Sequence, residues 1–195
     1  RRKAMLYILR HGKTDWNEQH KLQGRTDIPL NADGREMAEK ARAEYADVHF
    51  DVCFCSPLIR ARETAGILLR GRNVPIIPDE RLVEMSFGVC EGQEYSFDGA
   101  ESSFAADSPI KELFLHPERY TTPVEGGESF AQLFARTGEF LREVAFPLLE
   151  QGKDVLIVGH GAMNSSIVCQ VRGLPLEKFW SAGIENCKLL KLEAP

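Results

Sequence analysis

Residues 5–12 read MLYILRHG, a short apolar run that ends in Arg-His-Gly. A second run, VLIVGHG at residues 155–161, has the same form and ends in Gly-His-Gly. Short runs rich in β-branched and large apolar side chains predict buried strands, and two further runs of this kind cover residues 51–55 and 74–77. Because amphipathic helical segments separate most of these runs, the sequence predicts a layered α/β fold.

Capping residues and apolar periodicity place the helices. Asn31 is the predicted N-cap of a helix over residues 31–48, and Ser56 is the predicted N-cap of a helix that starts at Pro57 and runs to Leu69. Apolar residues at helical spacing predict a long core helix over residues 130–148, kinked by Pro147. The same spacing predicts a helix from Met163 that ends at Gly173, followed by a last strand over residues 188–192.

Composition restricts the kind of protein. The 195 residues carry 24 Lys and Arg against 29 Asp and Glu, a net charge of −5 that disfavours a broad nucleic-acid surface. No linker or repeat divides the chain, so we expect a single domain over residues 1–195. No stretch approaches the ~20 apolar residues of a membrane span, and Arg10 interrupts the N-terminal apolar run too early for a secretion signal. The five cysteines include no C-x-x-C pair, so we expect the protein in a reducing cytoplasm. The sequence does not indicate an oligomeric state.

Charged and polar residues follow several of the predicted strands. Parallel strands end at one edge of a sheet, so Arg10, His11, Arg60 and His160 are expected to meet there, with Glu84 joining them from a turn. Arginine forks and backbone N–H groups at helix N-termini bind phosphate oxygens. The sequence therefore predicts a phosphoryl-binding pocket, although either histidine alone is more often an ordinary polar loop residue.

Two other phosphate or metal sites were weighed. Gly12, Lys13 and Thr14 imitate the end of a P-loop, but that motif requires a glycine five residues before Gly12, where Tyr7 stands. A metal hydrolase has no support from dense His and Asp ligand spacing. We expect neither a metal nor a cofactor.

Ordered sequence blocks resemble the histidine phosphatase superfamily, which contains cofactor-dependent phosphoglycerate mutases and many phosphatases. The blocks are LRHGKTDWN, LQGRTDIPLNADG, SPLIRARETA, LVEMSFGVCEG, GGESF and VLIVGHGAM. They cover most of the chain. The resemblance implies a three-layer α/β/α sandwich with a mostly parallel central sheet, and an insertion around residues 90–123 that shapes the substrate pocket.

The resemblance also implies a role for each residue of the pocket. His11 matches the nucleophile that becomes phosphohistidine, and Glu84 matches the proton donor. Arg10, Arg60 and His160 match the groups that hold the phosphoryl oxygens. Apart from the resemblance, a cationic His160 is expected to join the two arginines in stabilising the charge of the transition state. Substrate contacts are expected from five further positions: Thr14, Asn17, Gln23, Gly24 and Gly161. Lys13 departs from the acidic residue of the mutases.

Three functions fit this pattern. Few cations follow Glu84, and aromatic residues are common between Tyr95 and Tyr120, so a cytoplasmic phosphomonoester hydrolase acting on a small phosphorylated metabolite is favoured. A cofactor-dependent phosphoglycerate mutase is the alternative, and it requires cations for a second anionic group. A non-catalytic phosphate-binding protein is the third possibility, but it would need neither a nucleophile at His11 nor a proton donor.

Overall fold

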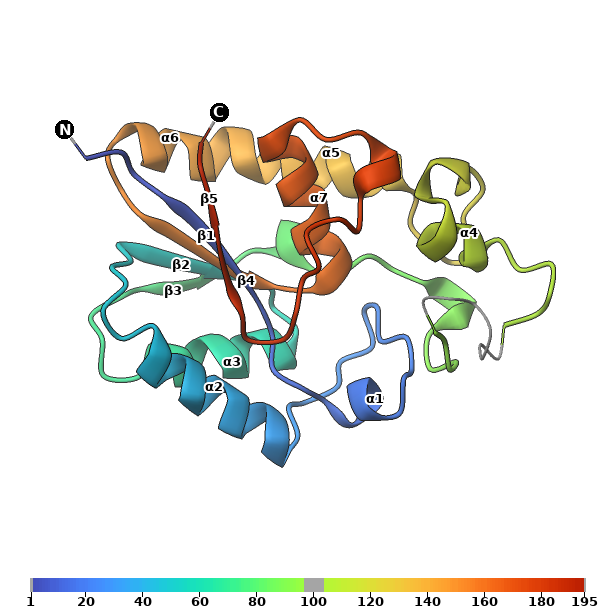
Figure 1. Ribbon diagram of the computed structural model, residues 1–195, viewed down its shortest axis with the longest axis horizontal. Helices are drawn as coiled ribbons and strands as arrows, with labels where there is room; N and C mark the ends of the chain where they lie inside the picture. Colours follow the sequence, from blue (N-terminus) through green and yellow to red (C-terminus); the bar gives the residue numbers. More distant parts are fainter. Residues whose placement is uncertain (1, 97–103, 195) are drawn as a thin grey trace.

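Five strands form one sheet in the order β3-β2-β4-β1-β5 (Figure 1). The computed structural model describes residues 2–96 and 104–194. Four strands run parallel to their neighbours, and β5 runs antiparallel to β1. The predicted α/β fold with a mostly parallel sheet is therefore confirmed, with strands at β1 (Leu6–Arg10), β2 (Val52–Cys55), β3 (Ile76–Pro78), β4 (Val155–Gly159) and β5 (Leu189–Leu192).

Helices cover both faces of the sheet, which gives the three layers (Figure 1). One face carries α2 (Ala32–Glu44) and α3 (Ile59–Leu68), and the other carries α5 (Phe130–Phe140), α6 (Phe146–Glu150) and α7 (Gly161–Arg172). Two short helices, α1 (Asp15–Glu18) and α4 (Ile110–Leu115), lie beyond the sheet. None of the helices in the described part of the chain has the length and apolar character of a membrane span.

The central strand β4 explains why two cores form. Val155 and Ile157 belong to the buried cluster under α5 and α7, while Leu156 and Val158 belong to the cluster under α2 and α3. Successive strand residues point to opposite faces, so an uninterrupted apolar strand suits a sheet covered on both sides. The two clusters also hold all five cysteines as buried free thiols.

Capping residues set the ends of α2 and α7 as the sequence predicts. The Asn31 side chain accepts a hydrogen bond from the Gly34 N–H at 2.8 Å and caps α2. Gly173 ends α7 in the left-handed conformation with φ 65°, which glycine adopts without a steric cost.

The predicted start of α3 is wrong. The helix begins at Ile59, two residues after Pro57, and its N-cap residue Leu58 makes no side-chain hydrogen bond. Asp27 supplies the missing acceptor from a distant loop, because its Oδ1 accepts the Ile59 N–H at 2.8 Å. The Ser56 hydroxyl is therefore not the N-cap group of α3. It accepts the N–H of Leu58, just before the helix, and it contacts His160.

The predicted long helix over residues 130–148 is interrupted before Pro147. Between α5 and α6, Leu141–Ala145 form a wider π-type turn, in which the Phe146 N–H donates to the Leu141 carbonyl. Pro147 has no N–H to donate to the residue four before it, and its ring crowds that carbonyl. The hydrogen-bond register therefore shifts ahead of the proline.

The aromatic segment around residues 90–123 divides its side chains between two roles. Tyr95 and Phe114 line a cavity, whereas Phe104 and Tyr120 are buried in the core next to α5. Phe97, which belongs to the same expected segment, lies outside the described residues.

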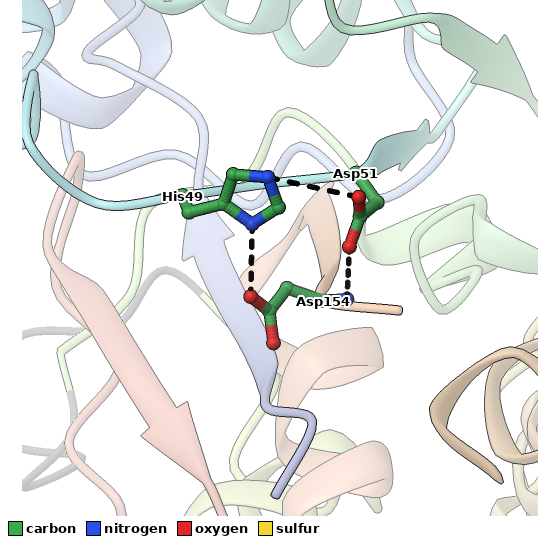
Figure 2. A group of neighbouring side chains, drawn as sticks. All are labelled: His49, Asp51 and Asp154. Atoms are coloured by element: carbon green, nitrogen blue, oxygen red, sulfur yellow. Dashed lines mark hydrogen bonds and ion pairs between the residues drawn. The ribbon is translucent and has the colours of Figure 1, made fainter. Parts of the chain in front are cut away.

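A polar cluster ties together the amino ends of three strands (Figure 2). His49 Nδ1 lies 3.0 Å from Asp154 Oδ2, and its Nε2 lies 3.6 Å from Asp51 Oδ1. The Asp154 N–H donates to Asp51 Oδ2 at 2.7 Å, and Asp154 accepts from Met5 N and from the Arg2 guanidinium, both at 2.8 Å. Asp154 therefore holds the chain just before β1, β2 and β4.

The substitution Asp154→Asn is expected to lower the free energy of unfolding by about 1–3 kcal/mol, the usual range for a lost charge-assisted hydrogen bond. At this chain length, each kcal/mol of lost unfolding free energy lowers Tm by ~2–4 °C. Burial raises the pKa of Asp154, but Arg2, His49 and Met5 outweigh it and hold the pKa below its ordinary 3.8. A depressed pKa gives stability that is present above pH 3.8 and is lost as the pH falls further.

Urea unfolding at pH 7 and at pH 3 checks this prediction. Exposed Glu150→Gln is the matched control and should leave stability unchanged. Equal unfolding free energies for the wild type and Asp154→Asn at pH 7 would contradict it.

Candidate functional site

A cavity of about 420 Å³ lies at the carboxyl ends of the parallel strands. Arg10 is the last residue of β1, Arg60 lies in the first turn of α3, and Gly161 starts α7 directly after β4. Eight of the ten predicted site residues line this cavity: Arg10, His11, Asn17, Gln23, Gly24, Arg60, Glu84 and Gly161. Thr14 and His160 stand behind its wall.

His11 is held in one tautomer by the backbone. Its Nδ1 lies 2.6 Å from the Gly12 carbonyl oxygen, which can only accept, so Nδ1 carries the proton and Nε2 keeps a lone pair. The ring is 2% exposed. Burial, with the nearby charges of Arg60 and Arg10, holds the pKa of His11 well below its ordinary value, so the ring stays neutral.

Two arginines, Arg10 and Arg60, line the cavity. Arg60 donates to the carbonyl oxygens of Gly24 at 2.6 Å and Thr26 at 2.7 Å, and Arg10 donates to the Ile184 carbonyl at 3.4 Å. Burial lowers the pKa of Arg60 to about 10, so the group remains charged at neutral pH. No described residue offers a partner to the Nε atom of either arginine.

The loop that accepts hydrogen bonds from Arg60 is itself held by Glu91, a residue that stands in no sequence pattern that predicts this role. Glu91 Oε1 accepts from the Thr26 N–H at 3.1 Å and the Thr26 hydroxyl at 2.6 Å, while Oε2 accepts from the Phe87 N–H at 3.0 Å. Gly24 has φ 54°, and a Cβ there would lie 2.2 Å from Glu91 Oε2. Close approach to Glu91 therefore requires glycine at this position.

Glu84 lies at the N-terminus of α7. Its Oε1 accepts from the N–H groups of Met85 at 2.7 Å and Met163 at 2.8 Å. Its Oε2 has a single partner among the described residues, the Ala162 N–H at 3.1 Å. Burial raises the pKa of Glu84, and these three N–H groups and Arg60 oppose it only in part. A carboxyl group held in this way can carry a proton on Oε2 at a higher pH than an exposed glutamate.

His160 packs behind the nucleophile candidate. Its ring centroid lies 5.3 Å from that of His11 at an angle of 58°, and its Nε2 lies 2.7 Å from the Ser56 hydroxyl oxygen. The Nδ1 atom is buried and no described residue offers it a partner. Burial, together with Arg60, lowers the pKa of His160 well below its ordinary value. Full burial among positive groups therefore disfavours a second proton on His160 in the protein alone. The cationic ring expected in the transition state stays a prediction.

Thr14 supports its neighbours from behind the cavity wall. Its hydroxyl donates to Gln23 Oε1 at 2.7 Å and accepts the Asn17 N–H at 3.2 Å, as the N-cap of α1. It thereby fixes two side chains that do line the cavity. Lys13 is exposed and lies outside the cavity.

The far side of the cavity is mostly aromatic. Phe114 stacks against Tyr95 with ring centroids 5.1 Å apart and against Trp180 at 5.7 Å. Lys21 also lines the cavity and adds a cation. Sequence reasoning missed Trp180 and Lys21, because neither stands in a periodic pattern or at a strand end.

The only cluster of His, Cys, Asp or Glu side chains within the described ranges that could hold a metal ion is His49, Asp51 and Asp154 (Figure 2). It lies at the amino ends of the strands, on the opposite edge from the cavity. The cavity itself presents nitrogens of Arg10, His11, Lys21 and Arg60 beside the two carboxylates of Glu84 and Glu185. The nitrogens are a donor set suited to an anion.

Comparisons with known proteins agree with this geometry. Residues 6–194 match the histidine phosphatase superfamily (branch 1). Phosphoserine phosphatase 1 of Hydrogenobacter thermophilus is 30% identical over 185 residues, 93% of this chain and 82% of that protein. A 2,3-bisphosphoglycerate-dependent phosphoglycerate mutase of Cytophaga hutchinsonii is 33% identical over 159 residues, 80% of this chain and 72% of the mutase. The structure of Bacillus stearothermophilus YhfR superposes with a TM-score of 0.81 at 30% identity, covering 96% of this chain and 90% of that one.

Proposed function

Since the chain is a phosphatase enzyme that belongs to the histidine phosphatase superfamily (branch 1), we propose that it hydrolyses small phosphomonoesters through a phosphohistidine at His11. One observation carries the proposal. Three buried side-chain nitrogens, Arg10 Nε, Arg60 Nε and His160 Nδ1, have no partner among the described residues. Buried donors without partners are costly, and the oxygens of a phosphoryl group beside His11 would satisfy all three.

The first half-reaction transfers the phosphoryl group to His11. The Nε2 lone pair attacks phosphorus while the bond from phosphorus to the ester oxygen breaks, and the proton on Glu84 Oε2 goes to that oxygen. The Gly12 carbonyl accepts from Nδ1–H throughout and aims the ring. The two guanidinium groups offset the charge that develops on the phosphoryl oxygens.

The second half-reaction returns the enzyme to its starting state. A water molecule attacks phosphorus, the Glu84 carboxylate takes its proton, and the Nε2–P bond breaks to release inorganic phosphate. Both His11 and Glu84 end in the protonation states in which they began. The arginines supply the positive charge that divalent metals provide in other phosphoryl-transfer sites, so the reaction is proposed to need no metal.

The aromatic side of the cavity supports a flat, uncharged leaving group. The stack of Tyr95, Phe114 and Trp180 contributes aromatic surface to the same cavity that Arg10 and His11 line. The segment around residues 90–123 supplies two of these three rings, which supports its proposed role in shaping the pocket.

Mutase activity is the second candidate, because Lys21 could hold a second anionic group of a retained substrate. A direct comparison separates the two functions. Purified protein is expected to hydrolyse 1-naphthyl phosphate with kcat/KM at least 100-fold above that for isomerisation of 3-phosphoglycerate, and to keep this activity in EDTA. Lys21→Met should leave the hydrolysis within a few-fold of the wild type. Isomerisation that exceeds hydrolysis, or hydrolysis lost in EDTA and restored by added metal, would contradict the proposal.

A further inference from the structure

Ser56 stands between β2 and α3 with its hydroxyl in a fully buried position. Its Oγ accepts the Leu58 N–H at 3.2 Å and lies 2.7 Å from His160 Nε2. These are the two contacts of the Ser56 hydroxyl within the part of the chain that the structure describes. The direction of the second bond depends on which nitrogen of His160 carries the proton.

The two possible directions leave different groups without partners. If Nε2 carries the proton and donates to Ser56, the buried hydroxyl has no acceptor for its own hydrogen and Nδ1 presents a bare lone pair. If the hydroxyl donates to Nε2, Ser56 is fully satisfied, and one N–H remains, on Nδ1. Each additional buried unsatisfied group is unfavourable, so the second arrangement is the more stable.

We infer that Ser56 is a positioning residue that fixes His160 in the tautomer with its proton on Nδ1. His160 then offers an N–H donor within range of the charges of Arg10 and Arg60. The opposite tautomer would turn a lone pair toward an oxygen of the phosphoryl group and repel it.

The two histidines of the site thereby hold the same tautomer for opposite purposes. In His11 the Gly12 carbonyl accepts from Nδ1–H and leaves the Nε2 lone pair free for attack. In His160 the Ser56 hydroxyl occupies the Nε2 lone pair and leaves Nδ1–H free to bind. The use of Nδ1–H in binding rests on the proposed function, whereas the tautomer itself does not.

The tautomer can be measured directly in the intact protein. Nitrogen-15 NMR of labelled protein at pH 7.5, with His160 assigned by comparison with His160→Gln, distinguishes a protonated ring nitrogen from a bare one. We expect the protonated signal at Nδ1 and the bare signal at Nε2. The reverse assignment, or a mixture of the two tautomers in the wild type, would overturn the inference whatever the enzyme hydrolyses.

Variants test whether Ser56 is the cause. Ser56→Ala is expected to give a mixture of tautomers and to raise the dissociation constant of inorganic phosphate about 10- to 100-fold, as for loss of a hydrogen bond to a charged group. Ser166→Ala is the control, because Ser166 is an equally buried hydroxyl that bonds to Thr137 and the Met163 carbonyl away from the cavity. It should change neither quantity.

An unchanged tautomer and unchanged phosphate affinity in Ser56→Ala would show that Ser56 does not fix the ring. A pure Nδ1–H tautomer in a protein without hydrolase activity would sustain the inference and defeat the proposed function. If Ser56→Ala does not fold, the wild-type spectrum still decides the tautomer.

Discussion

His11→Ala is expected to lower kcat for phosphomonoesters by about 10⁴-fold or more, the scale of loss when a covalent nucleophile is removed. The alanine side chain has no lone pair to attack phosphorus, so the two-step route is closed. Rapid quenching with phosphorus-32 substrate should label the wild type with an acid-labile, base-stable phosphoryl group and leave the variant unlabelled.

Lys13→Ala is the control for this experiment, because Lys13 is exposed and lies outside the cavity. It should be labelled like the wild type. Undiminished label in His11→Ala would place the nucleophile at another residue.

Glu84→Gln is expected to slow phosphoenzyme formation from alkyl phosphates by roughly 10²–10⁴-fold, the usual contribution of a general acid. An alkoxide needs a proton to leave, and the amide has none to give. p-Nitrophenolate leaves without a proton, so the rate of phosphoenzyme formation from p-nitrophenyl phosphate should fall less than about tenfold. The burst phase must be followed, because Glu84 is also the proposed base of the second step.

The pH profile gives an independent check with a defined sign. Because burial raises the pKa of Glu84, the proton is retained to a higher pH than usual, and the wild-type rate on alkyl phosphates should fall as the pH rises through that pKa. His11, with its pKa held well below its ordinary value, remains a neutral nucleophile over the same range. The descending limb should be missing in Glu84→Gln.

Stability must be measured alongside, since the glutamine amide would face the Ala162 N–H that now donates to Glu84 Oε2. A stable variant in which both ester classes slow equally would make Glu84 a structural group and not the proton donor.

That Arg10, His11 and His160 lie close together was predictable from the sequence, because the geometry of the sheet brings them together. Arg10 and His11 follow β1 and His160 follows β4, and neighbouring parallel strands place their carboxyl ends side by side. Position along the chain was therefore enough to place Arg10, His11 and His160 near one another.

Other features could not be predicted, because they depend on contacts between distant segments that leave no local sequence pattern. Asp27 caps α3 from another loop and so displaced the expected role of Ser56. Trp180 reaches the cavity by stacking on Phe114, and no periodicity marks that contact. The charge of His160 could not be predicted either, because its burial among arginines exists only in the folded chain.

The unpartnered nitrogens Arg10 Nε, Arg60 Nε and His160 Nδ1 would also link the proposed anion to the folding equilibrium. Without a ligand, these buried donors lower the free energy of unfolding, because they lose their hydrogen bonds to water when the chain folds. A ligand that binds only the folded chain adds RT ln(1 + [L]/Kd) to stability, about 1.4 kcal/mol for each tenfold of free phosphate above Kd. If phosphate binds as proposed, the resistance of this fold to heat and proteolysis is expected to rise with the phosphate concentration. Neutral replacements of these donors are then expected to lower activity and raise stability.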